Sequence, residues 1–309
     1  MRCLGLLLIF LSFPAFCAST EAVYGENGMV ASRSTLASSA GIEIMRQGGN
    51  AVDGAVATAF ALAVTYPSAG NLGGGGFAVV RFPDGKVVTL DHREKAPAKA
   101  HRDMYLDEAG NVDNHLARNT LLSSGVPGSV DGLIALQERY GSMPLSQVMA
   151  PAIRLADKGF EIDWYVARHF AQVRPKMLEH RASIEKFSIA GRPPEPGDTW
   201  RQPDLAETLQ RISDQGRKGF YEGETADLIV AEMVRSSGII SHADLSGYRS
   251  VWREPVRGRY RGYDIWSMGP PSSGGVLLIQ MLNMLEDHDL SASGWGSADT
   301  IHLMRSEEH

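Results

Sequence analysis

The sequence predicts a globular region of mixed helices and strands, and three neighbouring segments carry this prediction. Residues 35–47 read as a helix that a glycine pair closes. Ala51–Thr65 is small or apolar on every side and too short to span a membrane, which is typical of a buried helix. Phe77–Phe82 and Lys86–Asp91 should form a hairpin, because Pro83-Asp84-Gly85 between apolar runs is a strong turn signal.

Length and composition indicate a soluble protein with an ordinary core. The chain has 309 residues, which suits one large domain or two small ones. Its apolar content of 43% and charged content of 21% are typical of globular proteins. The formal net charge of −6 provides no basic surface, so we expect no nucleic-acid partner.

The first 19 residues predict a signal peptide. Met1-Arg2 gives a short positive start, Leu4–Phe16 is almost wholly apolar, and small residues follow for cleavage. An uncleaved membrane anchor is the alternative. Cys3 and Cys17 both lie in this segment, so the exported chain should lack cysteine nucleophiles, disulfides and thiolate metal sites. We therefore expect a periplasmic or secreted protein with no membrane attachment after the signal is removed.

Further elements are predicted along the rest of the chain. Asn50 with Asp53, and Ser241 with Asp244, should form capping boxes at two helix starts. Residues 101–123 and 188–203 look irregular. The remaining predicted elements are helices near 129–140, 144–158, 164–173, 204–215, 223–236 and 276–285, a further helix that begins at 297, and a hairpin that pairs 255–260 with 263–268.

A glycine-rich loop followed by an arginine is the main candidate for a functional site. Gly73–Gly76 precede a strand and lack the Lys-Ser/Thr of a phosphate-binding loop, which argues against a nucleotide. Arg93 follows the predicted hairpin and could bind a carboxylate through two parallel hydrogen bonds. The alternative is a surface salt bridge. His92 should face the opposite way from Arg93, because successive residues of a strand alternate.

Other motifs give no catalytic assignment from the residues alone. Ser272-Ser273 lack the G-x-S-x-G pattern of a nucleophile elbow. The nine histidines show no metal-ligand spacing, so no metal site is expected. The segment Pro270–Gly275 opens a helix and could hold an anion with its amides, but a structural turn is the simpler interpretation.

Several longer motifs together resemble the N-terminal, large-subunit portion of the γ-glutamyltransferases, also called γ-glutamyltranspeptidases or glutathione hydrolases. They occur in the family's order between about residues 24 and 304. The matching stretches are GMVAS (28–32), QGGNAVDGAVATAFALAVTYPSAGNLGGGGF (47–77), DHREKAPAKA (91–100), SGVPGSVDGL (124–133), YGSMPL (140–145) and MGPPSSGG (268–275).

The resemblance implies an α+β fold, the αββα four-layer sandwich of the N-terminal-nucleophile hydrolases. It also implies a precursor that cuts itself into two subunits. The new N-terminal threonine of the small subunit is then the nucleophile, with its own α-amine as the base. The enzyme cleaves γ-glutamyl amides such as glutathione and transfers the γ-glutamyl group to water, amino acids or peptides. No cofactor is involved.

The resemblance assigns one site residue to this chain. In the motif D-x-R-E-x-A-P the arginine binds the α-carboxylate of the γ-glutamyl group, and Arg93 takes that role. Residues 20–309 then form the large-subunit region, and the nucleophilic threonine lies beyond the end of the chain. No catalytic residue is therefore expected here, and the chain alone should be inactive. The last residues, Arg305–His309, depart from the family pattern.

Alternative functions remain open at this point. A relative with the same fold, such as a cephalosporin or glutaryl acylase or a poly-γ-glutamate depolymerase, would carry the same motifs in this half. A non-catalytic module that keeps only the arginine site is a further possibility. Amide hydrolysis would exclude the last of these, and the small subunit would distinguish the others.

Overall fold

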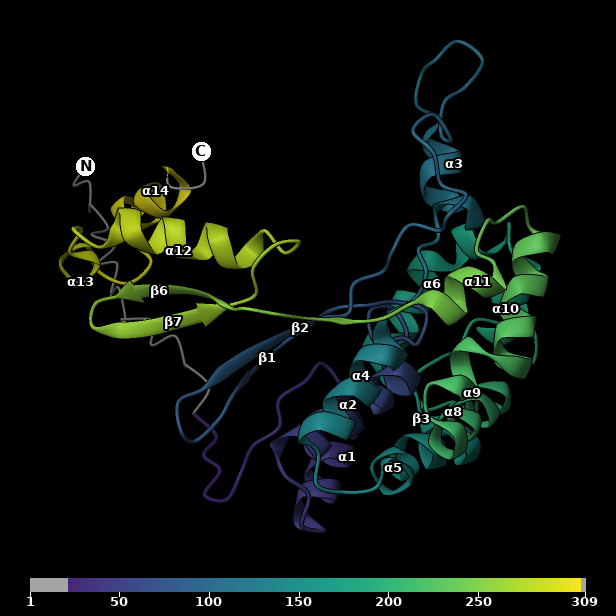
Figure 1. The fold of residues 1–309 in the computed structure, drawn as a ribbon, viewed down its shortest axis with the longest axis horizontal. Helices are drawn as coiled ribbons and strands as arrows, with labels where there is room; N and C mark the ends of the chain where they lie inside the picture. The colour runs from purple at the N-terminus through teal and green to yellow at the C-terminus, as the bar shows by residue number, and fades with distance from the viewer. Residues whose placement is uncertain (1–21, 307–309) are drawn as a thin grey trace, which may run out of the picture.

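The computed structural model describes residues 22–306, so the signal peptide predicted at residues 1–19 lies outside the described residues. A body made mainly of helices lies on one side, and a smaller C-terminal unit lies on the other (Figure 1). The elements of this C-terminal unit are β6 (Val256–Tyr260), β7 (Tyr263–Ser267), α12 (Gly274–Leu285), α13 (Leu290–Ser293) and α14 (Ala298–Ser306).

Two consecutive helices form the centre of the helical body. These are α1 (Thr35–Arg46) and α2 (Ala51–Thr65), and α2 also packs against α5 (Leu145–Lys158). The Asn50 side chain accepts a hydrogen bond from the Asp53 amide, and the Asp53 carboxylate accepts one from the Asn50 amide, which confirms the predicted capping box. Most of α2 is buried, as its uniformly small and apolar sequence predicted.

A three-stranded antiparallel sheet follows α2. Its strands are β1 (Phe77–Arg81), β2 (Val87–Asp91) and β5 (Val251–Arg253), in the order β1-β2-β5. The first residue of β1 lies opposite the last residue of β2, so the predicted hairpin is confirmed. Helix α4 (Ser129–Tyr140) packs against β2, and the stretch that contains β5 leads from the helical body to the C-terminal unit (Figure 1).

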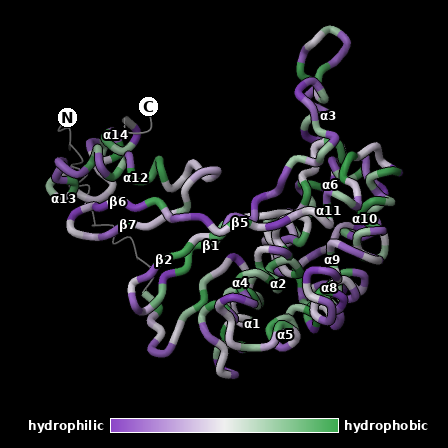
Figure 2. The backbone as a smooth tube through the Cα atoms, viewed as in Figure 1, coloured by the Kyte–Doolittle hydropathy of each residue, from purple (hydrophilic) through white to green (hydrophobic). Residues whose placement is uncertain are grey.

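The remaining helices of the body lie further along the chain. They are α6 (Trp164–Met177), α7 (Arg181–Lys186), α8 (Pro203–Gln215), α9 (Lys218–Tyr221), α10 (Gly223–Arg235) and α11 (His242–Gly247). The helices predicted at 164–173, 204–215 and 223–236 are thereby confirmed as α6, α8 and α10. Figure 2 shows hydrophilic residues along α8, and Leu209 and Ile212 of the same helix are buried.

Two segments that were expected to be irregular contain short elements. Residues 101–123 project as an arm (Figure 1) and include α3 (Asn114–Asn119) and the 3-10 turn η1 (Leu121–Ser123). The side chain of Asp113 caps α3 by accepting two backbone hydrogen bonds. In the 188–203 segment, β4 (Thr199–Trp200) pairs with β3 (Phe160–Glu161), a contact between distant residues that local patterns do not reveal.

The C-terminal elements agree with the sequence patterns. Strands β6 and β7 pair as the predicted second hairpin, and α12 begins two residues before the predicted position at 276. Ser241 and Asp244 form the second predicted capping box. Among residues 22–306, no helix is both long enough and apolar enough to cross a lipid bilayer.

Candidate functional site

Arg93 lies two residues after β2, and its side chain is 59% exposed. Its Nε lies 3.3 Å from Oε2 of Glu94, and its guanidinium carbon lies 5.9 Å from the centre of the Phe77 ring. Glu94 is the only acidic side chain among the described residues that pairs with Arg93. Since this contact is made at Nε, the outer end of the guanidinium can face a ligand.

The backbone of Arg93 is fixed by buried groups from other elements. The Asp91 carboxylate accepts a hydrogen bond from the Arg93 amide (3.0 Å) with one oxygen and from Nε of Arg253 (2.8 Å) with the other. The Tyr248 hydroxyl donates to the Arg93 carbonyl (2.7 Å). Burial raises the pKa of Tyr248, so this hydroxyl keeps its proton at neutral pH. Hydrogen bonds therefore hold both the amide and the carbonyl of Arg93, while its guanidinium stays exposed.

The glycine loop acts as a scaffold for the same backbone. The amide of Gly76 donates to the His92 carbonyl (3.2 Å), and the His92 amide donates to the Gly76 carbonyl (3.0 Å). A Cβ on Gly75 would lie 2.5 Å from the His92 carbonyl oxygen, so only glycine permits this approach. The loop also accepts hydrogen bonds at Gly74 from the amides that begin α4. The Gly76 amide and the Gly74 and Gly76 carbonyls thus bind the protein's own backbone.

A largely buried ion pair, Asp131–Arg217, supports this scaffold. Oδ1 of Asp131 on α4 accepts from Nε of Arg217 (2.8 Å), and Oδ2 accepts from the Ser250 amide (2.7 Å). Arg217 also donates to the carbonyl of Tyr248 (2.7 Å). The rings of Tyr248 and Tyr221 stack with centroids 5.9 Å apart, and the Tyr221 hydroxyl donates to the carbonyl that precedes Gly128. The network joins α4 to the stretch that enters β5.

Sequence analysis identified Arg93 and the glycine loop but missed most of these supporting residues. Asp91 could have been found, because an Asp side chain commonly accepts from the amide two residues later. Tyr248 is 155 positions from Arg93, and Arg217 is 86 positions from Asp131, so no local pattern reports them. The prediction that His92 and Arg93 face opposite ways is confirmed, since the His92 residue is only 8% exposed.

The Pro270–Gly275 segment forms the turn that the simpler interpretation of the sequence expected. The Ser272 amide donates to the Gly269 carbonyl, so the Pro270–Gly275 segment makes a turn before α12. The Ser273 side chain makes no capping hydrogen bond. Within the described part of the chain, His, Cys, Asp and Glu side chains form no group of three that could hold a metal ion.

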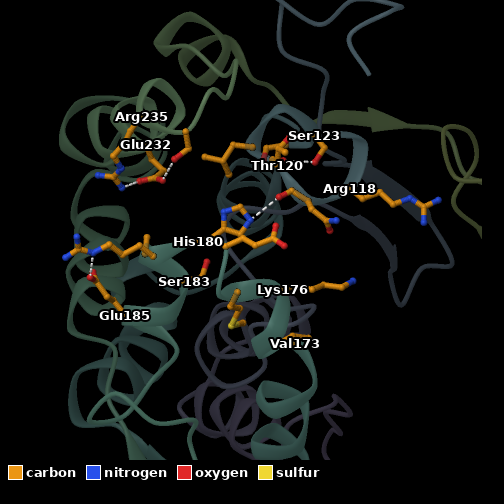
Figure 3. Close-up of a pocket in the computed structure, with 18 residues that line it drawn as sticks. Arg118, Thr120, Ser123, Val173, Lys176, His180, Ser183, Glu185, Glu232 and Arg235 are labelled. Atoms are coloured by element: carbon orange, nitrogen blue, oxygen red, sulfur yellow. Dashed lines mark hydrogen bonds and ion pairs between the residues drawn. The ribbon is translucent and has the colours of Figure 1, made fainter. Parts of the chain in front are cut away.

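A cavity of about 1040 Å³ lies away from this site, beside the base of the arm (Figure 3). Nε2 of His180 lies 3.0 Å from the Asn119 carbonyl oxygen there, and two arginines that line the cavity form ion pairs with glutamates of the same wall. Arg93 is not among its lining residues. A second cavity, of about 780 Å³, borders the glycine loop at Asn71–Gly73 and extends towards Trp200.

Comparison with known proteins agrees with this architecture. Residues 37–308 match the family described as Gamma-glutamyltranspeptidase. A glutathione hydrolase proenzyme from Escherichia coli strain K12 is 44% identical over 287 residues, which cover 93% of this chain and 50% of that protein. The crystal structure of Helicobacter pylori gamma-glutamyltranspeptidase superposes with a TM-score of 0.91 at 45% identity, covering 93% of this chain and 82% of the other. This chain therefore belongs to the gamma-glutamyltranspeptidase family.

The family assignment also establishes the fold class. The chain has the mixed helix-and-sheet fold of the N-terminal-nucleophile hydrolases, as the family resemblance implied. It spans about half the length of the curated relatives that it matches. One relative with a different printed activity, an Acylase ACY 1 proenzyme from Pseudomonas sp. strain V22, is 38% identical and is covered over 53% of its length.

Proposed function

We propose that this chain is the large-subunit portion of a γ-glutamyltransferase that hydrolyses glutathione and related γ-glutamyl amides. The family match and the names of the E. coli and H. pylori relatives support this proposal. The complete enzyme transfers the γ-glutamyl group to water, amino acids or peptides. It acts without a cofactor, in the periplasm or outside the cell, after the signal at residues 1–19 is removed.

In this proposal the chain binds substrate and the small subunit performs the covalent chemistry. The N-terminal threonine of the small subunit, produced by cleavage of the same precursor, attacks the γ-glutamyl carbonyl and expels the amine. Backbone amides stabilise the oxyanion, and water or an acceptor amine then resolves the acyl-enzyme. In this proposal the nucleophile and the general base both belong to the small subunit, and residues 20–309 contribute to substrate binding.

Arg93 would bind the α-carboxylate of the γ-glutamyl group. The observation that carries this role is an exposed guanidinium on a backbone that Asp91, Tyr248 and the glycine loop hold in place. A planar guanidinium matches a carboxylate with two parallel hydrogen bonds, whereas an ammonium cannot. Because the substrate carboxylate is charged in both the ground state and the transition state, this contact should contribute mainly to binding and orientation.

The second candidate is an acylase, because an Acylase ACY 1 proenzyme is 38% identical to this chain. A glutaryl group carries a carboxylate at the same distance from the scissile carbonyl as a γ-glutamyl group does, but it lacks the α-amine. Arg93 would therefore serve either substrate. Comparing kcat/KM for a γ-glutamyl anilide and a glutaryl anilide distinguishes the two activities, and we expect the γ-glutamyl compound to be preferred.

The test of Arg93 uses the precursor that contains the small subunit. Arg93→Ala should raise KM about ten- to a hundredfold, because hydrogen bonds to charged groups contribute roughly 1.5–3 kcal/mol. Arg93→Lys should restore only part of this loss. Arg102→Ala is the matched control, since that side chain lies in solvent nine residues further along. Self-cleavage should survive in all three variants. An Arg93→Ala enzyme that processes normally and keeps the wild-type KM would show that Arg93 has only a structural role.

A further inference from the structure

The imidazole of His92 is a buried polar group without an assigned role. The residue is 8% exposed, and Nδ1 has no hydrogen-bond partner among the described residues. Buried polar atoms in folded proteins are nearly always paired, so an unpaired one requires an explanation. His92 directly precedes Arg93, and its main chain carries the two hydrogen bonds to the glycine loop.

The ring fills the space between the glycine loop and α4. A Cβ added to Gly132 on α4 would lie 2.4 Å from both Cβ and Cγ of His92, so the absence of a side chain at that position admits the ring. On the other side, a Cβ on Gly76 would lie 3.1 Å from Cε1 of His92. The imidazole therefore lies between the glycine loop and α4 and keeps these two backbone segments apart. Arg93 is the next residue along the chain.

Among the described residues, the acidic groups near His92 are already paired and offer a protonated ring no free counter-charge. The acidic groups near His92 are Asp91, Glu94 and Asp131. Each of them already pairs with an arginine, in the contacts Asp91–Arg253, Glu94–Arg93 and Asp131–Arg217. Burial lowers the pKa of His92 below its usual value, although the three carboxylates act in the opposite direction. The neutral imidazole is thus the form that the folded site favours.

We propose that His92 is a positioning residue for Arg93. The neutral His92 ring fixes the distance between the glycine loop and α4, and protonation of the ring loosens this packing. The proposal rests on the proposed role of Arg93 in binding the substrate carboxylate. A second ring proton places a positive charge on a residue that is only 8% exposed, and burying an unpaired charge costs free energy. Because the nearby carboxylates already pair with arginines, protonation favours a looser packing in which solvent reaches the ring. Looser packing weakens the Gly76–His92 backbone hydrogen bonds that hold the glycine loop against the residue preceding Arg93.

The pH dependence of KM in the complete enzyme tests this proposal. The wild-type KM for a γ-glutamyl anilide should rise as the pH falls below about 6.5, the ordinary histidine value, and kcat should change less from this cause. His92→Phe fills a similar volume and cannot take up a proton, so its KM should lose that acidic rise. His101→Phe, which replaces an exposed histidine nearby, should keep the wild-type profile. Titrating groups of the substrate and small subunit are common to all the variants and cancel in the comparison.

A variant that removes the volume of the His92 ring distinguishes a positioning role from a role that depends only on ring protonation. His92→Ala should raise KM roughly tenfold at all pH values with a smaller effect on kcat, because the loop and Arg93 lose their spacer. His92→Phe should lose less than His92→Ala at neutral pH. If His92→Ala does not fold, the comparison of His92→Phe with His101→Phe still shows whether His92 causes the acidic rise in KM. A His92→Phe enzyme with the wild-type acidic rise in KM would overturn the proposal.

A measurement without catalysis distinguishes this proposal from the proposed function. In ¹⁵N-labelled protein, the His92 ring should titrate below pH 6.5, and hydrogen exchange at the Gly76 amide should accelerate, relative to His92→Phe, over the same pH range. Ring protonation that leaves exchange at Gly76 unchanged would overturn the positioning role, whatever the activity. If exchange behaves as expected but Arg93→Ala leaves KM unchanged, the assignment of Arg93 fails instead.

Discussion

Replacing Arg217 with alanine should lower the free energy of unfolding by about 3–5 kcal/mol, because it removes one member of a buried ion pair. Side-chain exposures are 19% for Arg217 and 7% for Asp131, and their closest atoms are 2.8 Å apart. The substitution also removes the donors to the carbonyls of Ser246 (2.9 Å) and Tyr248 (2.7 Å). Among residues 22–306, the Asp131 carboxylate would keep the Ser250 amide as its one hydrogen-bond donor.

The chain contains a matched control for this experiment. Arg154 and Glu43 form an ion pair of 2.7 Å between side chains that are 54% and 39% exposed. Its distance is similar to that of the buried pair, but solvent screens the interaction and replaces it when it is lost. Arg154→Ala should therefore cost no more than about 1 kcal/mol. The difference between the two variants therefore reports the burial of the Asp131–Arg217 pair together with the carbonyl hydrogen bonds that Arg217 makes and Arg154 does not.

Urea unfolding, followed by tryptophan fluorescence and circular dichroism, measures both losses. Arg217→Ala should shift the midpoint strongly at a constant m-value, whereas Arg154→Ala should leave it nearly unchanged. Removing both partners, Arg217 and Asp131, should cost less than the sum of the single losses, since no unpaired carboxylate remains. Equal midpoint shifts for the two arginine variants would refute the reasoning that burial of the pair determines its contribution.

Two further predictions concern positions that support the core. Asp53→Ala should cost at least about 3 kcal/mol, because its carboxylate accepts charged hydrogen bonds from Ser142 and Gln137. Burial raises the pKa of Asp53, but these hydrogen bonds lower it overall, so urea titrations should show wild-type stability falling below about pH 3.8 more steeply than that of Asp53→Asn. Gly128→Ala should cost roughly 1–3 kcal/mol in the same assay, because its Cβ would lie 2.1 Å from the His92 carbonyl oxygen; an unchanged midpoint would show that the backbone moves freely.

Features that depend on neighbouring residues could be predicted from the sequence. The turn at Pro83-Asp84-Gly85 determines the register of the first hairpin, and the capping boxes at Asn50 and Ser241 mark two helix starts. The burial of α2 follows from its composition alone. In each case the pattern and the contact lie within a few residues, so local chemistry determines the result.

The surroundings of Arg93 could be predicted only in part, because they are assembled by tertiary packing. The arginine and the glycine loop are visible as motifs, but the hydroxyl of Tyr248 and the pair Asp131–Arg217 come from distant segments. An isolated Asp or Tyr has no local feature that indicates burial. The short β3–β4 pair was missed for the same reason, since each strand has only two residues.

The close backbone packing around His92 also limits how this site can be re-engineered. A side chain at Gly75 or Gly128 would strike main-chain atoms, which cannot rotate away as a flexible side chain can. Libraries that randomise these glycines should therefore return mostly poorly folded clones. Attempts to change substrate preference should instead vary exposed side chains that border the guanidinium of Arg93, where new volume and charge extend into solvent.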